Sequence, residues 1–340
     1  MSVLISIIMP ALNEESKIEK ALKSIRMQNV NQEEIEILVV DGGSKDRTRE
    51  IALSYDARVL ENPQVVPEEA KRLGMYACSG KYVVFVDTDE EFTDKDQLGK
   101  RVQLFQSGNK VKAVLNNTLR TPKGYPDLTR YDNCYGDPFT LFVYRFDRED
   151  TIRSLDRKRY TYESAGVEGR IYFIKRDGLM PVGDGATTMI DFEYYKDNFS
   201  DKLDTSDFIA TLFDDIVNKK GCFGIVENDI VNHYTTAKFK TYLRKLKFRV
   251  ITNVYPNENI SGYTARAQSN SYLKMRKYLF LLYCLLPPVV LIDSAILAIQ
   301  KKCAVFMLHF VFTYYTLFVI GFIVLKKLFG IGSANTSYGK

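Results

Sequence analysis

The sequence has few cysteines and no CxxC pair among them. Its five cysteines are scattered along 340 residues, which argues against a disulfide framework and a zinc site and favours a reducing compartment. The N-terminal run VLISIIM has no basic leader and is stopped by Pro10, so we expect a buried strand there and not a secretory signal. The chain also shows no internal repeat or low-complexity tract, and its apolar content of 46% excludes a disordered protein.

Acidic residues become rare towards the C-terminus. Residues 1–237 carry 32 Lys/Arg and 40 Asp/Glu, whereas residues 238–277 carry 10 basic residues and one acidic residue. Segment 238–249 (KFKTYLRKLKFR) interleaves basic with apolar residues, as expected of an amphipathic helix on anionic lipid. Nucleic-acid binding is the alternative for such a segment, but this one runs directly into apolar stretches. We therefore expect membrane lipids as partners and no nucleic acid.

Two apolar stretches follow, 278–300 and 304–325, each close to the length that crosses a bilayer. Lysines bracket them, and the excess of Lys and Arg predicts that the N-terminal body is cytosolic. We expect a transmembrane helical hairpin in a multi-pass protein of the cell membrane or an endomembrane. Two buried core helices are the alternative, and the pair Pro287–Pro288 would break the first span, which leaves a re-entrant hairpin open.

The first 90 residues alternate short β-rich runs with helical patterns. Runs such as VLISIIM, EIEILVV and YVVFV are separated by expected helices at about 14–28, 46–54 and 67–78. This alternation predicts an α/β fold with a mostly parallel sheet and flanking helices. Residues 92–170 look irregular and suit a region that faces an acceptor, and a further helix is expected at 206–219.

Polar residues follow three of the expected strands: 10–15 (PALNEE), 41–46 (DGGSKD) and 87–91 (DTDEE). Ligands bind beyond the carboxyl ends of parallel strands, so these clusters should converge. DGGSKD alone suits a turn with Asp46 capping the next helix. Asp41 is not needed for that turn and could accept hydrogen bonds from a base or ribose.

Burying the carboxylates of DTDEE beside a core strand is costly without compensation. Two carboxylates separated by one small residue can hold a divalent cation that bridges to a diphosphate. A solvated acidic loop is the alternative for DTDEE taken alone. Three such clusters on neighbouring strands favour the metal site.

The set SIIMPALNEE, LVVDGGSKDRT and AKRLGMYACSGKYVVFVDTDEE resembles the nucleotide-sugar half of family 2 glycosyltransferases with the GT-A fold. The resemblance implies that Pro10, Asn13 and Glu14 border the nucleotide, that Asp41 reads the base, and that Asp87 lies near the ribose or sugar. It implies that Asp89, with Asp87 beside it, coordinates Mn²⁺ or Mg²⁺. Lys71 and Arg72 stand where the family often has an Arg-Asn pair, so one of them would reach the donor.

The likeness is weaker in the second half. The family's general base is an Asp at the start of a helix, and Asp207 is our choice here, although Ser206 stands where the family has Glu. Four other acids compete with it: Asp191, Glu193, Asp214 and Asp215. His233 is a candidate ligand of the metal or the diphosphate, and a structural histidine is the alternative.

Together these features predict an inverting, metal-dependent glycosyltransferase that uses a UDP- or GDP-sugar and a lipid-linked acceptor at the cytosolic membrane face. A polyprenyl-phosphate sugar synthase, a membrane-bound nucleotidyltransferase and a receptor without activity are the alternatives. A nucleotidyltransferase would normally carry a Gly-rich phosphate loop where this chain has ALNEES. We expect a catalytic domain at 1–237, a basic interfacial segment at 238–277, two transmembrane helices at 278–328 and a tail at 329–340.

Overall fold

The computed structural model describes residues 3–107, 110–166, 168–174, 180–181, 183, 187–204, 208–235, 238–254, 266 and 271–330. The chain divides into two compact units. Unit 1 comprises residues 1–120 and 149–234, and unit 2 comprises residues 121–148 and 235–340.

Unit 1 is built on a 9-stranded sheet with the order β3-β2-β1-β4-β10-β6-β11-β9-β8. Its first four strands, β3 (Arg58–Glu61), β2 (Ile35–Asp41), β1 (Ile5–Ala11) and β4 (Tyr82–Phe85), are parallel, as the βαβ pattern predicts. The other half is mixed: β10 (Met189–Asp191) runs antiparallel to both β4 and β6 (Ala113–Leu115). β11 (Cys222–Val226) is parallel to β6, whereas β9 (Gly169–Phe173) and β8 (Tyr162–Ala165) continue the sheet in antiparallel fashion.

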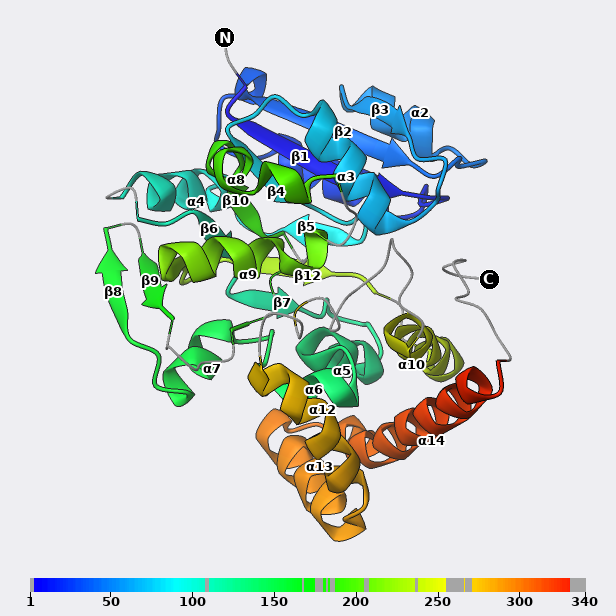
Figure 1. Cartoon of the computed structure of the whole chain (residues 1–340). Coiled ribbons are helices and arrows are strands. Elements are labelled where there is room, and N and C mark those ends of the chain that lie inside the picture. Colours follow the sequence, from blue (N-terminus) through cyan, green and yellow to red (C-terminus); the bar gives the residue numbers. More distant parts are fainter. Residues whose placement is uncertain are drawn as a thin grey trace. The chain divides into compact units, whose positions relative to one another are not determined.

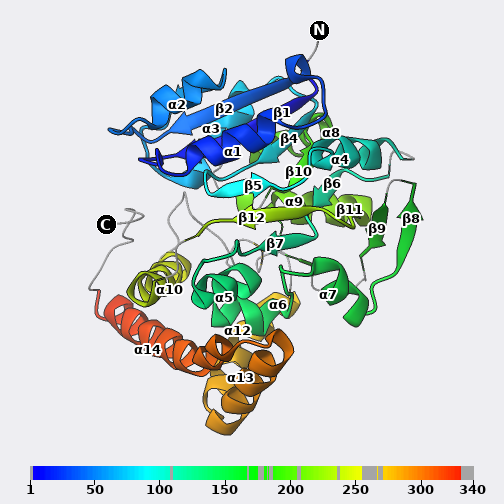
Figure 2. The same cartoon turned by 180° about the vertical axis from the view of Figure 1, so that it is seen from behind.

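Helices cover both faces of this sheet, which explains why its central strands are apolar on both sides. α3 (Pro67–Ala77), α8 (Phe192–Phe199) and α9 (Phe208–Lys220) lie on one face (Figure 1). α1 (Ile18–Arg26), α2 (Thr48–Ser54) and α4 (Gln97–Gln106) lie on the other (Figure 2). A side chain on Gly74 of α3 would come within 2.4 Å of Ile8, so this glycine lets α3 pack directly on β1.

A small second sheet positions part of the site. It has the order β5-β12-β7, with β5 at Glu90–Phe92, β12 at Ile230–His233 and β7 at Thr118–Arg120. β5 follows the DTD sequence without a break and pairs antiparallel with β12. The described residues of unit 1 also contain α7 (Thr151–Arg157).

Unit 2 is helical. It contains α5 (Asp127–Tyr135), α6 (Pro138–Tyr144), α10 (Phe239–Val254), α12 (Ser271–Cys284), α13 (Pro287–Lys301) and α14 (Leu308–Leu328). Region 92–170, whose sequence pattern looks irregular, contains α4, α5, α6 and α7 as well as short strands, and its role in facing an acceptor stays a prediction.

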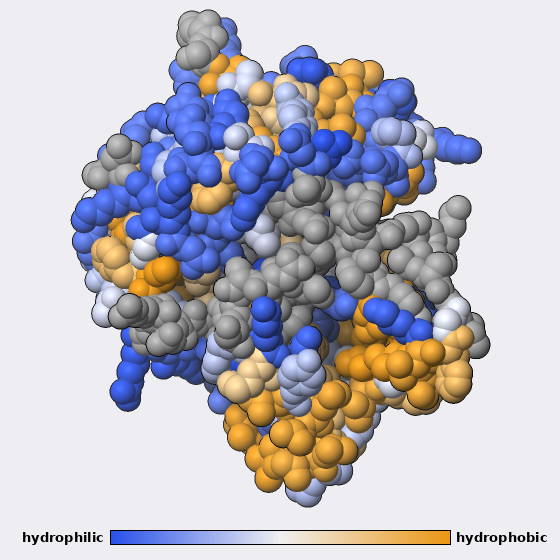
Figure 3. All heavy atoms as spheres, viewed as in Figure 1, coloured by the Kyte–Doolittle hydropathy of each residue, from blue (hydrophilic) through white to orange (hydrophobic). Residues whose placement is uncertain are grey.

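The first apolar stretch does not form one helix. It breaks before Pro287, as the proline pair predicts, and Tyr272–Cys284 and Pro287–Lys301 are bent by 101°. Within the described residues, Ala304–Leu328 is the one unbroken helix whose length and composition would allow it to cross a membrane, and the bent pair would make a second if it forms one span. In Figure 3, hydrophobic residues gather on the surface over α13 and α14.

Candidate functional site

The acidic run that follows β4, residues 87–91, lies beside a lysine of α3. Asp87 lies just beyond the strand, where its backbone N–H donates to Glu90 Oε2 at 2.9 Å. Lys71 of α3 approaches from the side, with its Nζ 3.7 Å from Asp87 Oδ1. The Lys71 side chain is 9% exposed and that of Asp87 is 44% exposed, so the carboxylate faces solvent while the ammonium is held by the protein.

Asp89 lies opposite His233. The pairing of β5 with β12 sets His233 against Glu90 in register, and His233 Nε2 lies 3.5 Å from Asp89 Oδ1. The backbone N–H of Tyr234 also donates to the carbonyl of Asp89 at 2.7 Å. The structure therefore places His233 at the acidic run, and its role as a ligand of the metal or the diphosphate stays a prediction.

Glu90 is buried beneath the two aspartates, at 2% exposure. Burial and the neighbouring Asp87 raise the pKa of Glu90 to about 8, while His233 works in the opposite direction. A protonated Glu90 would remove one negative charge from the run. This would compensate for part of the cost of placing several carboxylates beside a buried strand.

Lys17, which is not among the residues predicted from the sequence, supplies a second part of this compensation. Its Nζ lies 3.1 Å from Glu14 Oε2 and 3.9 Å from Asp89 Oδ2, so one ammonium joins the first cluster to the third. Burial nevertheless raises the pKa of Glu14, although Lys17 works against this shift. Glu14 and Lys17 are three residues apart in the sequence, and this spacing could have indicated their ion pair.

The first two clusters are tied to each other. Asn13 has a positive φ of 54°, its backbone N–H donates to Ser44 Oγ, and its side-chain oxygen accepts from the N–H of Lys45 at 2.9 Å. The N–H of Glu14 donates to Thr48 Oγ1 at 2.7 Å. Pro10 precedes this loop in β1, opposite Val40 of β2. The carboxyl ends of β1 and β2 thus form one hydrogen-bonded platform.

Asp41 organises the turn that follows it. Its carboxylate accepts hydrogen bonds from the N–H groups of Gly43 and Ser44 and from the Ser44 hydroxyl, and its side chain is fully buried. The expectation that the turn does not need Asp41 is therefore wrong. That Asp41 also reads a base stays a prediction.

Lys71 and Arg72 have different environments. Arg72 donates to both carboxylate oxygens of Glu69, at 2.7 and 2.6 Å, and this pairing raises its pKa. Between the two candidates, Lys71 is the one whose ammonium lies beside the acidic run.

The predicted general base, Asp207, lies outside the described residues. Among its competitors, Asp191 caps α8 by accepting from the N–H of Tyr194, and it pairs with Lys112 at 2.6 Å. Asp215 pairs with Lys202 at 2.6 Å. Asp191 and Asp215 therefore have structural partners of their own, and the choice of Asp207 over Glu193 and Asp214 stays a prediction.

The donor set at the acidic run suits a divalent cation. A carboxylate oxygen of Asp89 and a ring nitrogen of His233 face each other, with Asp87 on the same short segment. Mn²⁺ and Mg²⁺ both accept carboxylate ligands, but Mg²⁺ strongly prefers oxygen. A set that includes imidazole therefore fits Mn²⁺ better.

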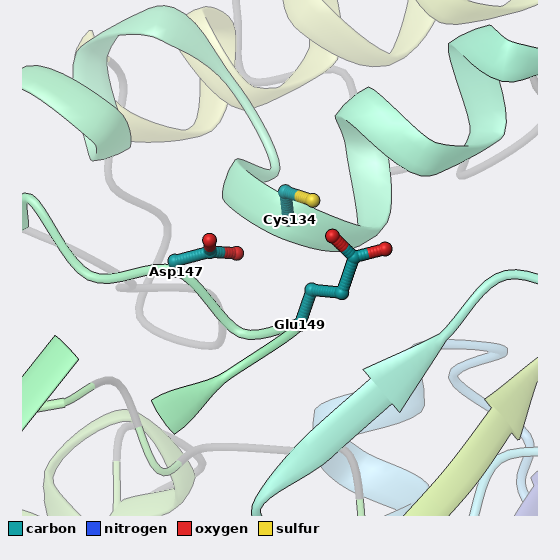
Figure 4. A group of neighbouring side chains, drawn as sticks. All are labelled: Cys134, Asp147 and Glu149. Carbon is teal, nitrogen blue, oxygen red and sulfur yellow. The ribbon is translucent and has the colours of Figure 1, made fainter. Parts of the chain in front are cut away.

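Another group of possible ligands lies at the edge of unit 2. The sulfur of Cys134 and the carboxylate of Asp147 lie within 4.8 Å of each other, and Figure 4 draws them with Glu149, two residues farther along the chain. Lys301 Nζ already lies 2.5 Å from Asp147. Because the ammonium balances this carboxylate, we assign no metal there.

Known proteins resemble this chain over part of its length. AglE of Haloferax volcanii, named a glycosyltransferase, is 32% identical over 136 residues, which cover 38% of this chain and 44% of that protein. The GalNAc(5)-diNAcBac-PP-undecaprenol beta-1,3-glucosyltransferase of Campylobacter jejuni is 32% identical over 128 residues, 35% of this chain and 40% of that protein. Glucosyl-3-phosphoglycerate synthase of Mycobacterium tuberculosis is 40% identical over 93 residues, 25% of this chain and 28% of that protein. The aligned part thus spans less than half the length of these relatives.

A likeness in structure extends farther. The crystal structure of S. aureus TarS 1-349 in complex with UDP-GlcNAc matches 97% of this chain and 93% of that chain, with a TM-score of 0.50 and 13% identity. At this identity the likeness shows the fold alone, and it supports the GT-A arrangement that the sequence resemblance implies. The family model described as glycosyl transferase family 2 matches residues 6–199, which is more than half of the chain and includes both aspartates of the DTD sequence. The chain therefore belongs to glycosyl transferase family 2.

Proposed function

We propose that this protein is an inverting, metal-dependent glycosyltransferase that moves a sugar from a nucleotide-diphosphate sugar to a lipid-linked acceptor at the cytosolic face of a membrane. The observation that carries the proposal is the meeting of Asp87, Asp89 and His233 at the carboxyl end of β4, next to the platform formed by β1 and β2. Family membership agrees with this geometry.

On the donor side, the platform around Asn13 and Ser44 would hold the nucleoside. Lys71 would bind the diphosphate or the sugar, since its ammonium already stands 3.7 Å from Asp87. Asp89 and His233 would hold Mn²⁺ or Mg²⁺. When bound, such an ion neutralises the charge that develops on the leaving nucleoside diphosphate.

On the acceptor side, a carboxylate would remove the proton from the attacking hydroxyl, and Asp207 remains our choice. Attack on the anomeric carbon from the face opposite the leaving group inverts its configuration. Polyprenyl-phosphate sugar synthases are the alternative, because their phosphate acceptor is already anionic and needs no base. The sequence EEFTD after DTD departs from the Leu-Gln-His-Pro-Pro usual in those enzymes, which favours a hydroxyl acceptor.

The apolar helices of unit 2 and the basic residues of α10 support an association with the membrane. The name of the Campylobacter relative includes an undecaprenol-linked acceptor, which supports a lipid-linked acceptor here. We propose the cytosolic side for unit 1 because Lys and Arg flank the apolar helices. The sequence predicts two crossings for these helices.

A thermal-shift screen of UDP-, GDP- and TDP-sugars tests the donor half of the proposal. We expect one nucleotide class to raise the melting temperature only when Mn²⁺ is present. The absence of metal-dependent stabilisation by any of them would overturn the proposal. Transfer to a polyprenyl phosphate, compared with transfer to a lipid-linked saccharide, separates the two acceptor classes.

A further inference from the structure

We infer that unit 2 is a monotopic membrane anchor: α14 lies in the plane of an anionic membrane surface, and α12 and α13 dip into the same leaflet. The way in which the chain meets the bilayer is independent of the donor, the metal and the reaction.

α10 and α14 run side by side in the same direction. The rings of Tyr242 and Phe312 lie 4.7 Å apart near one end of the pair. Val250 packs with Val319 and Ile323 farther along. At the other end, Lys327 Nζ donates to the carbonyl of Val254 at 2.7 Å. The contact covers about 22 Å of α14 at 1.5 Å per residue.

This contact decides how α14 can meet the membrane. If α14 crossed the bilayer, α10 would have to cross beside it. Arg244 and Lys247 are exposed on α10 and lie between the contacts at its two ends, level with the middle of α14. Their charges would then stand in the hydrocarbon core, where basic side chains are costly.

An in-plane helix removes that conflict. The buried side chains of α14 include Phe312, Val319 and Ile323, whereas Val311, Phe318 and Leu325 are exposed on another face. The apolar exposed face can enter the acyl chains while α10 stays at the level of the headgroups. α10 has three exposed basic residues, Lys240, Arg244 and Lys247, and no acidic residue, so it complements anionic lipid.

The bent pair of helices, α12 and α13, begins and ends beside the same segment of unit 2. Near its beginning, Arg276 donates to the carbonyl of Phe142, and at its end Lys301 pairs with Asp147. Both partners belong to segment 121–148 of the same unit. Between them, Leu285 and Leu286 at the bend are 70% and 53% exposed. At about 21–23 Å each, neither helix spans the roughly 30 Å hydrocarbon core alone.

The absence of tryptophan from the chain makes a depth measurement direct. Single replacements Val311→Trp, Phe318→Trp and Leu325→Trp place one fluorophore at three points along the exposed face of α14. The full chain would be reconstituted in vesicles of phosphatidylcholine with a minority of phosphatidylglycerol, brominated at shallow or deep acyl positions. Leu285→Trp is the control inside the bilayer, and Leu53→Trp, 61% exposed on α2, is the control outside it.

We expect the three α14 positions to share one quenching profile, with the shallow bromines the more effective. A profile in which Phe318→Trp is quenched mainly by deep bromines, and the two flanking positions by shallow ones, would show a crossing helix and overturn the inference. Quenching of none of the three would overturn it as well. If one replacement prevents folding, Phe322→Trp on the same face takes its place. The readout requires no catalytic activity, so an error in the proposed reaction leaves it unaffected.

Discussion

His233 Nε2 lies 3.5 Å from Asp89 Oδ1, although the two residues come from distant parts of the chain. The antiparallel pairing of β5 with β12 creates this contact, because it sets His233 opposite Glu90. The acidic run therefore has a nitrogen donor that belongs to a separate strand.

Replacing Asp89 tests the metal site. Asp89→Ala should lower kcat for sugar transfer by roughly 10²–10³-fold, because the charge on the leaving diphosphate would lose its stabilisation. Melting temperature should remain close to that of the wild type. Glu50→Ala is the matched control, since Glu50 is an exposed carboxylate paired with Arg47 on the surface of α2. Full activity of the Asp89 variant would place the metal elsewhere.

Replacing His233 tests which metal the site prefers. His233→Asn should reduce Mn²⁺-supported kcat/KM by about 10–100-fold, the range seen when groups that support a metal site are removed. Mg²⁺-supported activity should fall less, because Mg²⁺ prefers oxygen ligands. Activity would be measured across a concentration series of each ion. Equal losses with both ions would indicate that His233 has a structural role only.

Lys71 and Arg72 form a matched pair of neighbouring cations. Lys71→Met should lower kcat/KM by about 10–100-fold through a higher KM for the donor, since a hydrogen bond to a charged group contributes about 1.5–3 kcal/mol. Arg72→Met should change the KM much less, because Arg72 is committed to Glu69. Steady-state kinetics with varied donor would show the difference, and the reverse order of effects would refute the assignment.

A buried ion pair supports the second sheet. Arg101 and Asp229 are both fully buried, with Arg101 Nε 2.7 Å from Asp229 Oδ2. Arg101→Met should destabilise unit 1 by about 3–5 kcal/mol, because it leaves the carboxylate buried without its partner. Chemical denaturation would measure the loss. The exposed Arg47→Met is the control, for which we expect no measurable change in stability.

Asp132 in α5 predicts a pH dependence. Burial raises the pKa of Asp132, but Arg249, Lys245 and Arg148 more than offset this and hold it below its ordinary value. A carboxyl group with a lowered pKa in the folded state stabilises the fold above the pKa of the unfolded state, near 3.9, and this contribution is lost as the pH falls. Asp132→Asn should therefore lower the melting temperature at about pH 7, and the difference from the wild type should shrink below about pH 4. A difference that is independent of pH would contradict this account.

The sequence predicted those parts of the molecule in which a strand or helix pattern is directly followed by a cluster of polar residues. The strands before residues 10, 41 and 87 are short apolar runs that end in polar clusters, so both the parallel half of the sheet and its active edge could be inferred. Helix boundaries were less accurate: α1 begins at Ile18, not near residue 14, because 12–17 form the loop that packs on the Ser44 turn.

Other features depend on contacts between distant segments. Nothing local in 121–148 indicates that α5 and α6 pack with α12, α13 and α14, since their apolar faces find partners only after the chain returns. The role of Lys17 depends in the same way on the position of Asp89. For Asp41 the prediction failed in another way. The sequence suggested that the turn after β2 does not need this carboxylate, but it accepts hydrogen bonds from Gly43 and Ser44 within that turn. The predicted domain boundaries and the roles assigned to single site residues stay predictions.

The link between Asn13 and the turn at Ser44 has a consequence for binding energetics. Asn13 adopts a left-handed backbone conformation that costs free energy, and the hydrogen bonds to Ser44 and Lys45 maintain it without any ligand. The nucleoside would therefore meet two loops that are already ordered with respect to each other. Binding the donor should lose little conformational entropy in this part of the protein, so discrimination between bases would depend on the shape of a rigid surface and not on the ordering of a loop.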